Sequence, residues 1–404
     1  MRGIRPDTVG LITALDKLGV FSNARIRAAF GTVPRAMFLP NIAADEVYTD
    51  RAIITKRDTT GAAISSSSQP TMMAQMLTQL DLQPGMNVLE IGAGTGYNAA
   101  IMQALVGSEG RVTSIELDVD VANQARDNLQ RAGYGSVHVV EADGAAGYSP
   151  RAAYDRIICT ATAWDVPAAW VRQLKQRGRL VTPIQVHAAQ VSAAFEMQRD
   201  GTLYSEHNLP CRFVLMRGAA GVPDLVRQIG SSALTLWSLD ADDIDGARLH
   251  LLLTEDHDVS YLSEPLSADN FWSGLMPFTM LNAPSDVTLA TYFIAEDQKA
   301  YGMEAGSGYA IFSPASAVFV PYQEKGLAHT FAGSDAFIMA QTMLDDWNSM
   351  SRPGVENLRL LLTPHGQEPL PTLEKGRTYR RVDHDLHVWL QPVGDPTHAD
   401  LDEE

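Results

Sequence analysis

The sequence predicts an α/β domain at its start, followed by a smaller α+β domain. Two stretches predict the first domain. Residues 88–100, VLEIGAGTGYNAA, lead from an apolar strand through three glycines into a helical pattern. Residues 111–116, RVTSIE, are a β-rich run that ends in an acid, Glu116, about 20 residues after the glycines. That spacing suits a carboxylate that binds ribose hydroxyls at the tip of the second strand.

The glycine stretch favours S-adenosylmethionine over a nicotinamide cofactor. Glycine is needed there because the backbone must turn tightly and let a ligand approach without a Cβ in the way. Gly92, Gly94 and Gly96 follow the spacing G-x-G-x-G rather than G-x-G-x-x-G, and the first strand also ends in an acid, Glu90. A glycine turn alone is equally typical of a plain strand–helix connection. The acid that ends the second strand favours a nucleoside cofactor, and the glycine spacing with Glu90 favours a Rossmann-like class I methyltransferase domain.

Composition indicates a protein without a membrane segment or a metal centre. The chain has 404 residues, of which 45% are hydrophobic and 20% charged. It lacks an apolar run long enough to span a bilayer and a signal-like N-terminus, so a cytoplasmic protein is expected. Cys159 and Cys211 do not form a metal-like pair. His384 and His387 lie three apart in a strand-like run, so their side chains point to opposite faces and no metal site is expected.

Charge divides the chain into two parts. Residues 1–218 contain 21 Lys and Arg against 20 Asp and Glu, whereas residues 219–404 contain 10 against 28. With a loose segment at 218–223, this predicts a methyltransferase domain over 1–218 and an acidic α+β domain over 219–404. An acidic surface repels phosphate, so nucleic acid is not an expected partner. The acidic domain is either a well-solvated surface or a surface that attracts a basic segment of a polypeptide substrate.

Other elements follow from local patterns. A helix is predicted near 8–18 and another over 71–80, and the four serines of 65–68 are expected to form its entry rather than a strand. In the second half, residues 335–350 predict a helix, and five strand-like runs are found at 249–253, 288–294, 317–320, 358–362 and 386–390.

Four motifs in order resemble the protein-L-isoaspartate O-methyltransferase family. They are VPRAMFLP at 33–40, YTD at 48–50, ISSSSQP at 64–70 and the glycine stretch at 88–100. Residues 141–148, 154–159 and 174–183 are similar to the family's later strands and loops, so the resemblance covers about 25–215. Two departures fall on the acceptor side. Ala36 stands where bacterial repair enzymes usually carry an acid, and the single family serine is here the last of four.

The resemblance implies roles for particular residues. Asp143 and Gly144 would lie beside the adenine, and Ser68 would lie between the methyl donor and the accepting carboxylate. A carboxylate is already ionised at neutral pH, so no general base is required, and the hydroxyls of Ser66, Ser67 and Ser68 would fix it in place. The predicted cofactor-binding residues are Glu90, Gly92, Ala93, Gly94, Gly96, Tyr97, Glu116, Leu117, Asp143 and Gly144.

Two substrates are compatible with these residues. One is an isoaspartyl residue of a damaged protein. The other is an aspartate of a modified ribosomal peptide, as in the methyltransferases that accompany lanthipeptides and graspetides. Those relatives resemble this chain in the serine-rich stretch and in a C-terminal domain that repair enzymes are expected to lack, so peptide modification is favoured. A catalytically inactive scaffold is the remaining alternative, which the intact glycines, Glu116 and Ser68 disfavour.

Overall fold

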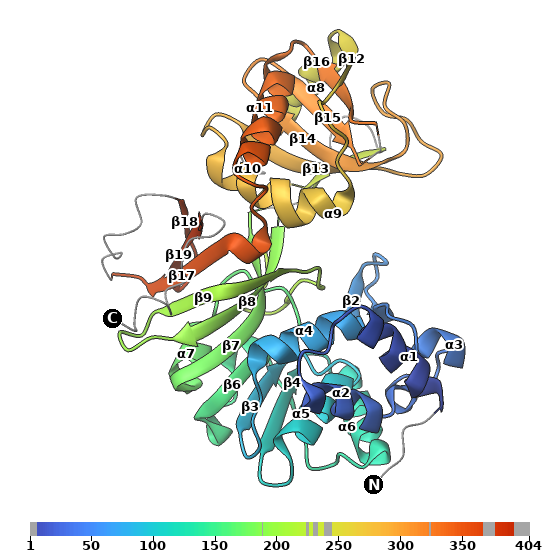
Figure 1. Ribbon diagram of the computed structural model, residues 1–404, viewed down its shortest axis with the longest axis vertical. Coiled ribbons are helices and arrows are strands. Elements are labelled where there is room, and N and C mark those ends of the chain that lie inside the picture. Colours follow the sequence, from blue (N-terminus) through green and yellow to red (C-terminus); the bar gives the residue numbers. More distant parts are fainter. Residues whose placement is uncertain are drawn as a thin grey trace.

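The computed structural model describes residues 6–187, 189–223, 226–228, 233–237, 245–322, 325–366 and 376–391 (Figure 1). Within them lie a ten-stranded sheet, a seven-stranded sheet and a two-stranded hairpin. The ten-stranded sheet has the order β18-β19-β17-β9-β8-β7-β6-β3-β4-β5. The seven-stranded sheet has the order β10-β11-β13-β14-β15-β16-β12.

One half of the ten-stranded sheet is parallel and carries the glycine stretch. Its central strands are buried on both faces, as is typical of parallel sheets, whereas the edge strand is partly exposed. In β3, for example, Val88 contributes to one core and Leu89 to the core on the opposite face. The parallel strands are β3 (Asn87–Ile91), β4 (Arg111–Glu116), β5 (His138–Glu141), β6 (Tyr154–Cys159) and the start of β7 (Leu174–Val186).

Helices of the N-terminal half share one core with these strands. They are α1 (Pro6–Lys17), α2 (Ala24–Thr32), α4 (Pro70–Leu80), α5 (Tyr97–Val106) and α6 (Val119–Ala132). Shorter segments connect them: η1 (Arg35–Phe38), α3 (Ala44–Val47), η2 (Gly144–Ala146), η3 (Ser149–Arg151) and α7 (Ala168–Gln173). The hairpin, β1 (Ile53–Arg57) and β2 (Ala63–Ser67), precedes α4.

The other half of the ten-stranded sheet is antiparallel, and the end of the chain completes it. After β8 (Ala189–Met197) and β9 (Leu203–Pro210), the next strand in space is β17 (Leu358–Pro364). Strand β17 pairs with β9 through Leu360–Ser205, Leu361–Tyr204 and Leu362–Leu203. Strands β19 (His384–Leu390) and β18 (Arg377–Arg380) follow it, after η5 (Val355–Asn357).

Between β9 and β17 the chain builds the second sheet, which is antiparallel throughout. Its strands are β10 (Val226–Gln228), β11 (Leu234–Trp237), β12 (His257–Tyr261), β13 (Thr288–Ile294), β14 (Gly306–Phe312), β15 (Ala317–Pro321) and β16 (Leu327–Phe331). The helical segments with it are α8 (Gly246–Thr254), α9 (Ala268–Asn270), the short π-helical η4 (Phe271–Leu275), α10 (Met276–Asn282) and α11 (Asp335–Ser349).

The two sheets are joined by a continuous apolar core. One cluster of buried side chains includes Leu89 and Phe195 of the first sheet, Trp347 of α11 and Tyr309 of the second sheet. Figure 1 shows the second sheet and its helices above the N-terminal half of the molecule, with the chain running down from α11 to β17. No helix among the described residues is long and apolar enough to cross a membrane.

Three predictions from local pattern compare clearly with the structure. The helix predicted for 335–350 is confirmed as α11. The strand predicted at 249–253 is wrong, because these leucines lie in α8, where Leu249 and Leu253 are buried four residues apart. The serine stretch was expected to be a helix entry, yet Ser65–Ser67 form part of β2, because they pair with β1 in the hairpin. The division at residue 219 stays a prediction, although β17–β19 belong to the first sheet.

Candidate active site

The glycine stretch forms a tight loop between the end of β3 and the start of α5. The backbone φ angles of Gly92, Gly94 and Gly96 are 96°, 51° and 84°, values that favour glycine. A Cβ on Gly92 would lie 2.6 Å from Thr160 Oγ1, and one on Gly94 would lie 3.4 Å from the carbonyl oxygen of Ser66. The loop therefore requires glycine because it passes closely between the end of β6 and strand β2.

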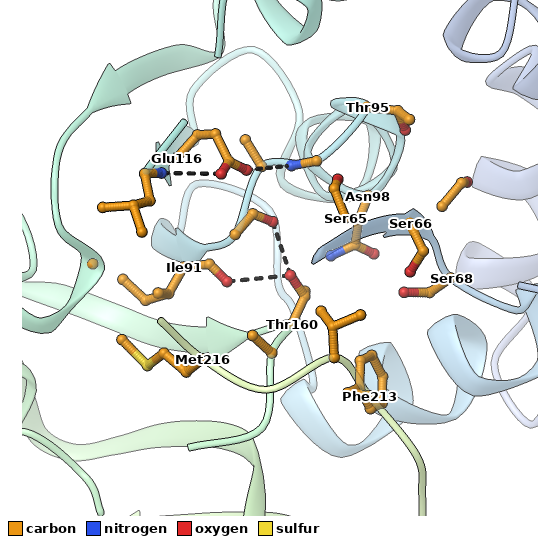
Figure 2. A pocket seen from close by; sticks show the side chains of 18 of the residues that line it. Ser65, Ser66, Ser68, Ile91, Thr95, Asn98, Glu116, Thr160, Phe213 and Met216 are labelled. Carbon is orange, nitrogen blue, oxygen red and sulfur yellow. Dashed lines mark hydrogen bonds between the residues drawn. The ribbon is translucent and has the colours of Figure 1, made fainter. Parts of the chain in front are cut away.

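Glu116 holds this loop from the tip of β4. One carboxylate oxygen accepts a hydrogen bond from Gly94 N at 2.9 Å, and the other accepts from Leu117 N at 3.0 Å (Figure 2). The side chain lines a cavity and is 8% exposed. The acid at the end of the second strand and the glycine loop, which the sequence predicts to act together, are thus in direct contact.

The cavity lies where three parts of the chain meet. It encloses about 990 Å³, counting the part that opens to solvent. Its floor is the glycine loop with Glu116 and Thr160, and a second wall comes from β2 and the start of α4. Thr160 Oγ1 donates to the carbonyl oxygens of Gly92, at 2.8 Å, and Ile91, at 3.2 Å (Figure 2). The third wall is the segment after β9, which contributes Phe213, Val214, Leu215, Met216 and Arg217.

All four serines line the cavity, and they alternate as strand residues do. Ser65 and Ser67 are buried, whereas Ser66 and Ser68 are partly exposed. The Ser65 hydroxyl accepts a hydrogen bond from Thr55 at 3.2 Å, and the buried Ser67 hydroxyl has no partner among the described residues. Figure 2 shows the Ser66 and Ser68 hydroxyls close together in the same part of the cavity.

Charged residues beside the cavity connect the segments that form its walls. Asp118 Oδ2 lies 2.7 Å from Arg217 Nη2 and 3.2 Å from Lys56 Nζ of β1. Lys56 also contacts Asp120, at 2.6 Å. Burial opposes ionisation of Asp118, but the hydrogen bonds and charges of Arg217 and Lys56 outweigh it and hold its pKa below the usual value. These ion pairs tie the hairpin, the residues after β4 and the segment after β9 to one another.

Three predicted cofactor residues do not line the cavity. Glu90 is fully buried and accepts hydrogen bonds from Asn98 and Ser114. Burial raises its pKa to about 7, partly offset by these two hydrogen bonds. Gly96 packs against Leu129 of α6. Asp143 accepts from Ala145 N at 2.9 Å and Ala219 N at 2.8 Å, so its carboxylate fixes two turns.

The structure brings the remaining predicted residues together around the cavity. They are Ser66, Ser67, Ser68, Gly92, Ala93, Gly94, Tyr97, Glu116, Leu117 and Gly144. Sequence reasoning missed Thr160, Ser65 and the segment 213–217. That segment carries no motif, and it reaches the cavity through backbone pairing: Thr162 N donates to Val214 O, and Met216 N donates to Thr162 O, both at 2.8 Å.

Comparison with known proteins identifies relatives of the first half of the chain. The profile of the family described as protein-L-isoaspartate(D-aspartate) O-methyltransferase matches residues 7–220. A protein-L-isoaspartate O-methyltransferase of Methanopyrus kandleri is 39% identical over 212 residues, which are 52% of this chain and 91% of the relative. One of Hyperthermus butylicus is 38% identical over 219 residues, 52% of this chain and 88% of the relative.

A solved structure extends the similarity beyond that half. A protein-L-isoaspartate O-methyltransferase superposes with a TM-score of 0.51 and 26% identity, covering 88% of this chain and 96% of its own. The expectation that such enzymes lack a counterpart of the C-terminal part is therefore wrong, because this coverage exceeds what residues 7–220 supply. The family profile and the relatives together show that the chain belongs to the protein-L-isoaspartate O-methyltransferase family and is an S-adenosylmethionine-dependent carboxyl O-methyltransferase.

Proposed function

We propose that this enzyme methylates an aspartate side chain in a modified ribosomal peptide. The ester is then attacked by the next backbone amide, which expels methanol and leaves an aspartimide that opens to isoaspartate. One observation carries the proposal: the cavity wall formed by β2 and the start of α4, which we call the acceptor wall, has four serines where the family motif has one. Three of them belong to β2, and Ser68 follows the strand. A changed acceptor wall favours a changed acceptor, because specificity arises from contacts that suit one substrate better than its competitor.

The cavity residues fit a nucleoside cofactor. Because Gly92 and Gly94 have no Cβ, the glycine loop can lie close to Thr160 and Ser66 in the cavity lining. The Glu116 carboxylate lies beside this loop. We assign cofactor contact to Gly92, Ala93, Gly94, Glu116, Leu117 and Gly144, all of which line the cavity. Glu90, Gly96 and Asp143 would support these residues through the packing and hydrogen bonds described above. When bound, S-adenosylmethionine supplies a methyl group on a sulfonium for in-line transfer to a carboxylate oxygen.

The acceptor side works by position rather than by proton transfer. A carboxylate nucleophile is ionised at neutral pH, so the chain needs to orient it and exclude water. The hydroxyls of Ser66 and Ser68 are partly exposed in one part of the cavity and can each donate one hydrogen bond to it. Ser67, whose buried hydroxyl lacks a partner among the described residues, is a third donor. We further propose that residues 219–404 recognise the peptide.

Repair of isoaspartyl residues in damaged proteins is the second candidate. It is favoured by the solved protein-L-isoaspartate O-methyltransferase that aligns with 88% of this chain, because an added C-terminal part then does not distinguish the two functions. Repair and modification use the same displacement at a carboxylate oxygen. They differ in the peptide that enters the cavity.

Mass spectrometry of two competing substrates separates these functions. The purified enzyme is incubated with S-adenosylmethionine and either an isoaspartyl test peptide or a modified precursor peptide encoded beside its gene. We expect methylation of the precursor at an aspartate, followed by loss of methanol, and little methylation of the test peptide. Methylation of the isoaspartyl peptide alone would establish repair. Failure to methylate either peptide, in an enzyme that binds S-adenosylhomocysteine in calorimetry, would contradict both assignments.

A further inference from the structure

Arg35 is a buried cation that bonds to backbone rather than to an acid. It lies in η1 and is 1% exposed. Its guanidinium donates to the carbonyl oxygens of Thr49, at 2.9 Å, Arg51, at 3.2 Å, and Ser68, at 3.1 Å. Its carbon lies 5.8 Å from the ring centre of Tyr97, a cavity residue. A charge without a paired carboxylate is costly to bury, so this placement calls for an explanation.

Asp50 binds the residues that follow Ser68, whose carbonyl oxygen accepts from Arg35. One carboxylate oxygen accepts a hydrogen bond from Thr71 N at 2.9 Å. The other accepts from Thr71 Oγ1 at 2.7 Å and from Gln69 Nε2 at 3.1 Å. Asp50 thus fixes the start of α4, directly after the last serine. Arg35 binds the backbone on either side of Asp50 as well, so the two residues form one connected unit.

The hydrogen bonds bring three sequence motifs into contact. Arg35 belongs to VPRAMFLP, Thr49 and Asp50 belong to YTD, and Ser68 and Gln69 belong to ISSSSQP. Three hydrogen bonds of Arg35 and Asp50 join these stretches. Two more connect Asp50 to Thr71, the residue that follows the third stretch. The three stretches meet at the part of the acceptor wall where the chain passes from strand β2 into α4. A planar guanidinium suits this task because its donors have fixed directions.

We propose that Arg35 and Asp50 are positioning residues for methyl transfer, which fix the backbone of residues 68–71 and so set where the Ser68 hydroxyl meets the acceptor carboxylate. Neither side chain lines the cavity, so they act through Ser68 and not by contact with substrate. Small displacements of an orienting group lower the rate of transfer strongly. The cofactor side of the cavity is held separately by Glu116 and Thr160. Substitution of Arg35 or Asp50 should therefore lower the rate of methyl transfer and leave the affinity for the cofactor unchanged.

The test compares Arg35→Lys with Arg25→Lys. Lysine keeps the charge but cannot direct planar donors at three carbonyls at once. Arg25 is a matched control because it also donates to backbone carbonyls, those of Leu82 and Leu105, away from the cavity.

We expect R35K to lower kcat by about tenfold or more. The dissociation constant for S-adenosylhomocysteine should stay within about twofold. R25K should change neither quantity. The substrate is whichever peptide of the preceding experiment is methylated.

A second variant keeps the test decisive if R35K does not fold. Asp50→Asn replaces one accepting oxygen with a donor and should lower kcat in the same way, whereas Asp200→Asn, at a turn where a carboxylate also accepts from a threonine N–H and hydroxyl, should not. Effects of R35K and D50N should combine less than multiplicatively, because both act on one segment. Wild-type kcat in R35K or D50N would overturn the proposal. So would a loss of cofactor affinity that parallels the loss of kcat, since it would indicate general destabilisation.

Discussion

Glu116 is the residue on which the proposed cofactor site depends most directly. Its two oxygens accept hydrogen bonds from Gly94 N and Leu117 N, so it shapes the loop as well as lining the cavity where we propose that the ribose binds. Glu116→Gln replaces one acceptor with a donor that faces an N–H or a ribose hydroxyl. Hydrogen bonds to charged groups contribute about 1.5–3 kcal/mol, so affinity for S-adenosylhomocysteine should fall about tenfold to a hundredfold. Calorimetry measures this.

The control makes the same chemical change at an exposed site. Glu109→Gln removes a surface carboxylate outside the cavity and should leave the affinity unchanged. Equal affinities of E116Q and the wild type would exclude Glu116 from cofactor binding.

Glu90 makes stability depend on pH. Burial raises its pKa from 4.5 to about 7, so the folded state binds this proton more tightly than the unfolded state does. The stability that Glu90 contributes is therefore complete below about pH 4.5 and is lost as pH rises to about 7. The shift corresponds to about 3 kcal/mol. In Glu90→Gln this dependence should vanish, because glutamine does not titrate.

Thermal unfolding across pH measures the effect of Glu90. The Tm of E90Q relative to the wild type should rise between about pH 4.5 and 7 and then level off. A Tm difference that stays constant over this range would show that Glu90 does not titrate in the folded protein.

Local chemistry explains which site residues the sequence could predict. Gly92, Gly94 and Glu116 are found because the turn and the strand end each demand one residue type. Phe213 and Met216 could not be found, because they reach the cavity only through the backbone pairing of Thr162 with the segment after β9. The contact is non-local, and nothing in the residues themselves signals it.

Among the elements, β2 and α8 show two reasons why a prediction from local pattern can be wrong. Serine is a poor strand former, yet Ser65–Ser67 extend because β1 supplies the partner strand and the cavity supplies the facing surface. In α8 a leucine-rich run reads as a buried strand, and a helix forms instead because Asp245 caps it through Ala247 N and Arg248 N. The parallel strands are predictable because their apolar runs match their burial.

Strand β17 determines how the C-terminal part can be removed experimentally. A chain that ends at residue 218 lacks β17, so β9 loses the partner that covers Leu203 and Ser205, both buried. We expect this truncation to aggregate or to unfold at a markedly lower Tm. An internal excision that joins residue 222 to residue 354 by a Gly/Ser linker keeps all ten strands of the first sheet.

The excision variant tests the proposed role of the second sheet. It should bind S-adenosylhomocysteine with nearly wild-type affinity and fail to turn over the precursor peptide. Full turnover by the excised enzyme would contradict peptide recognition by this part. A truncation at 218 that unfolds cooperatively at the wild-type Tm would instead show that residues 1–218 fold alone.

At the scale of the whole molecule, the acidic excess and the residues that line the cavity lie in different parts of the chain. The acidic excess lies in residues 219–404, whereas every residue that lines the cavity precedes residue 218. Arg217, which lines the cavity, and Lys56 beside it are already paired with Asp118. A basic peptide would therefore be attracted first to the inserted sheet, and its acceptor carboxylate would reach the cavity afterwards.

Because the second sheet is inserted between β9 and β17, we expect the protein to remain assembled after the chain is cleaved in this region. A protease that cleaves within the second sheet's loops leaves one fragment ending beyond β9 and another carrying β17, β19 and β18. We expect the fragments to stay associated through the β9–β17 pairing and the apolar core that both share. Two separately expressed pieces, split in that region, should assemble into a working enzyme, so the methyltransferase can be divided into halves whose reunion switches activity on.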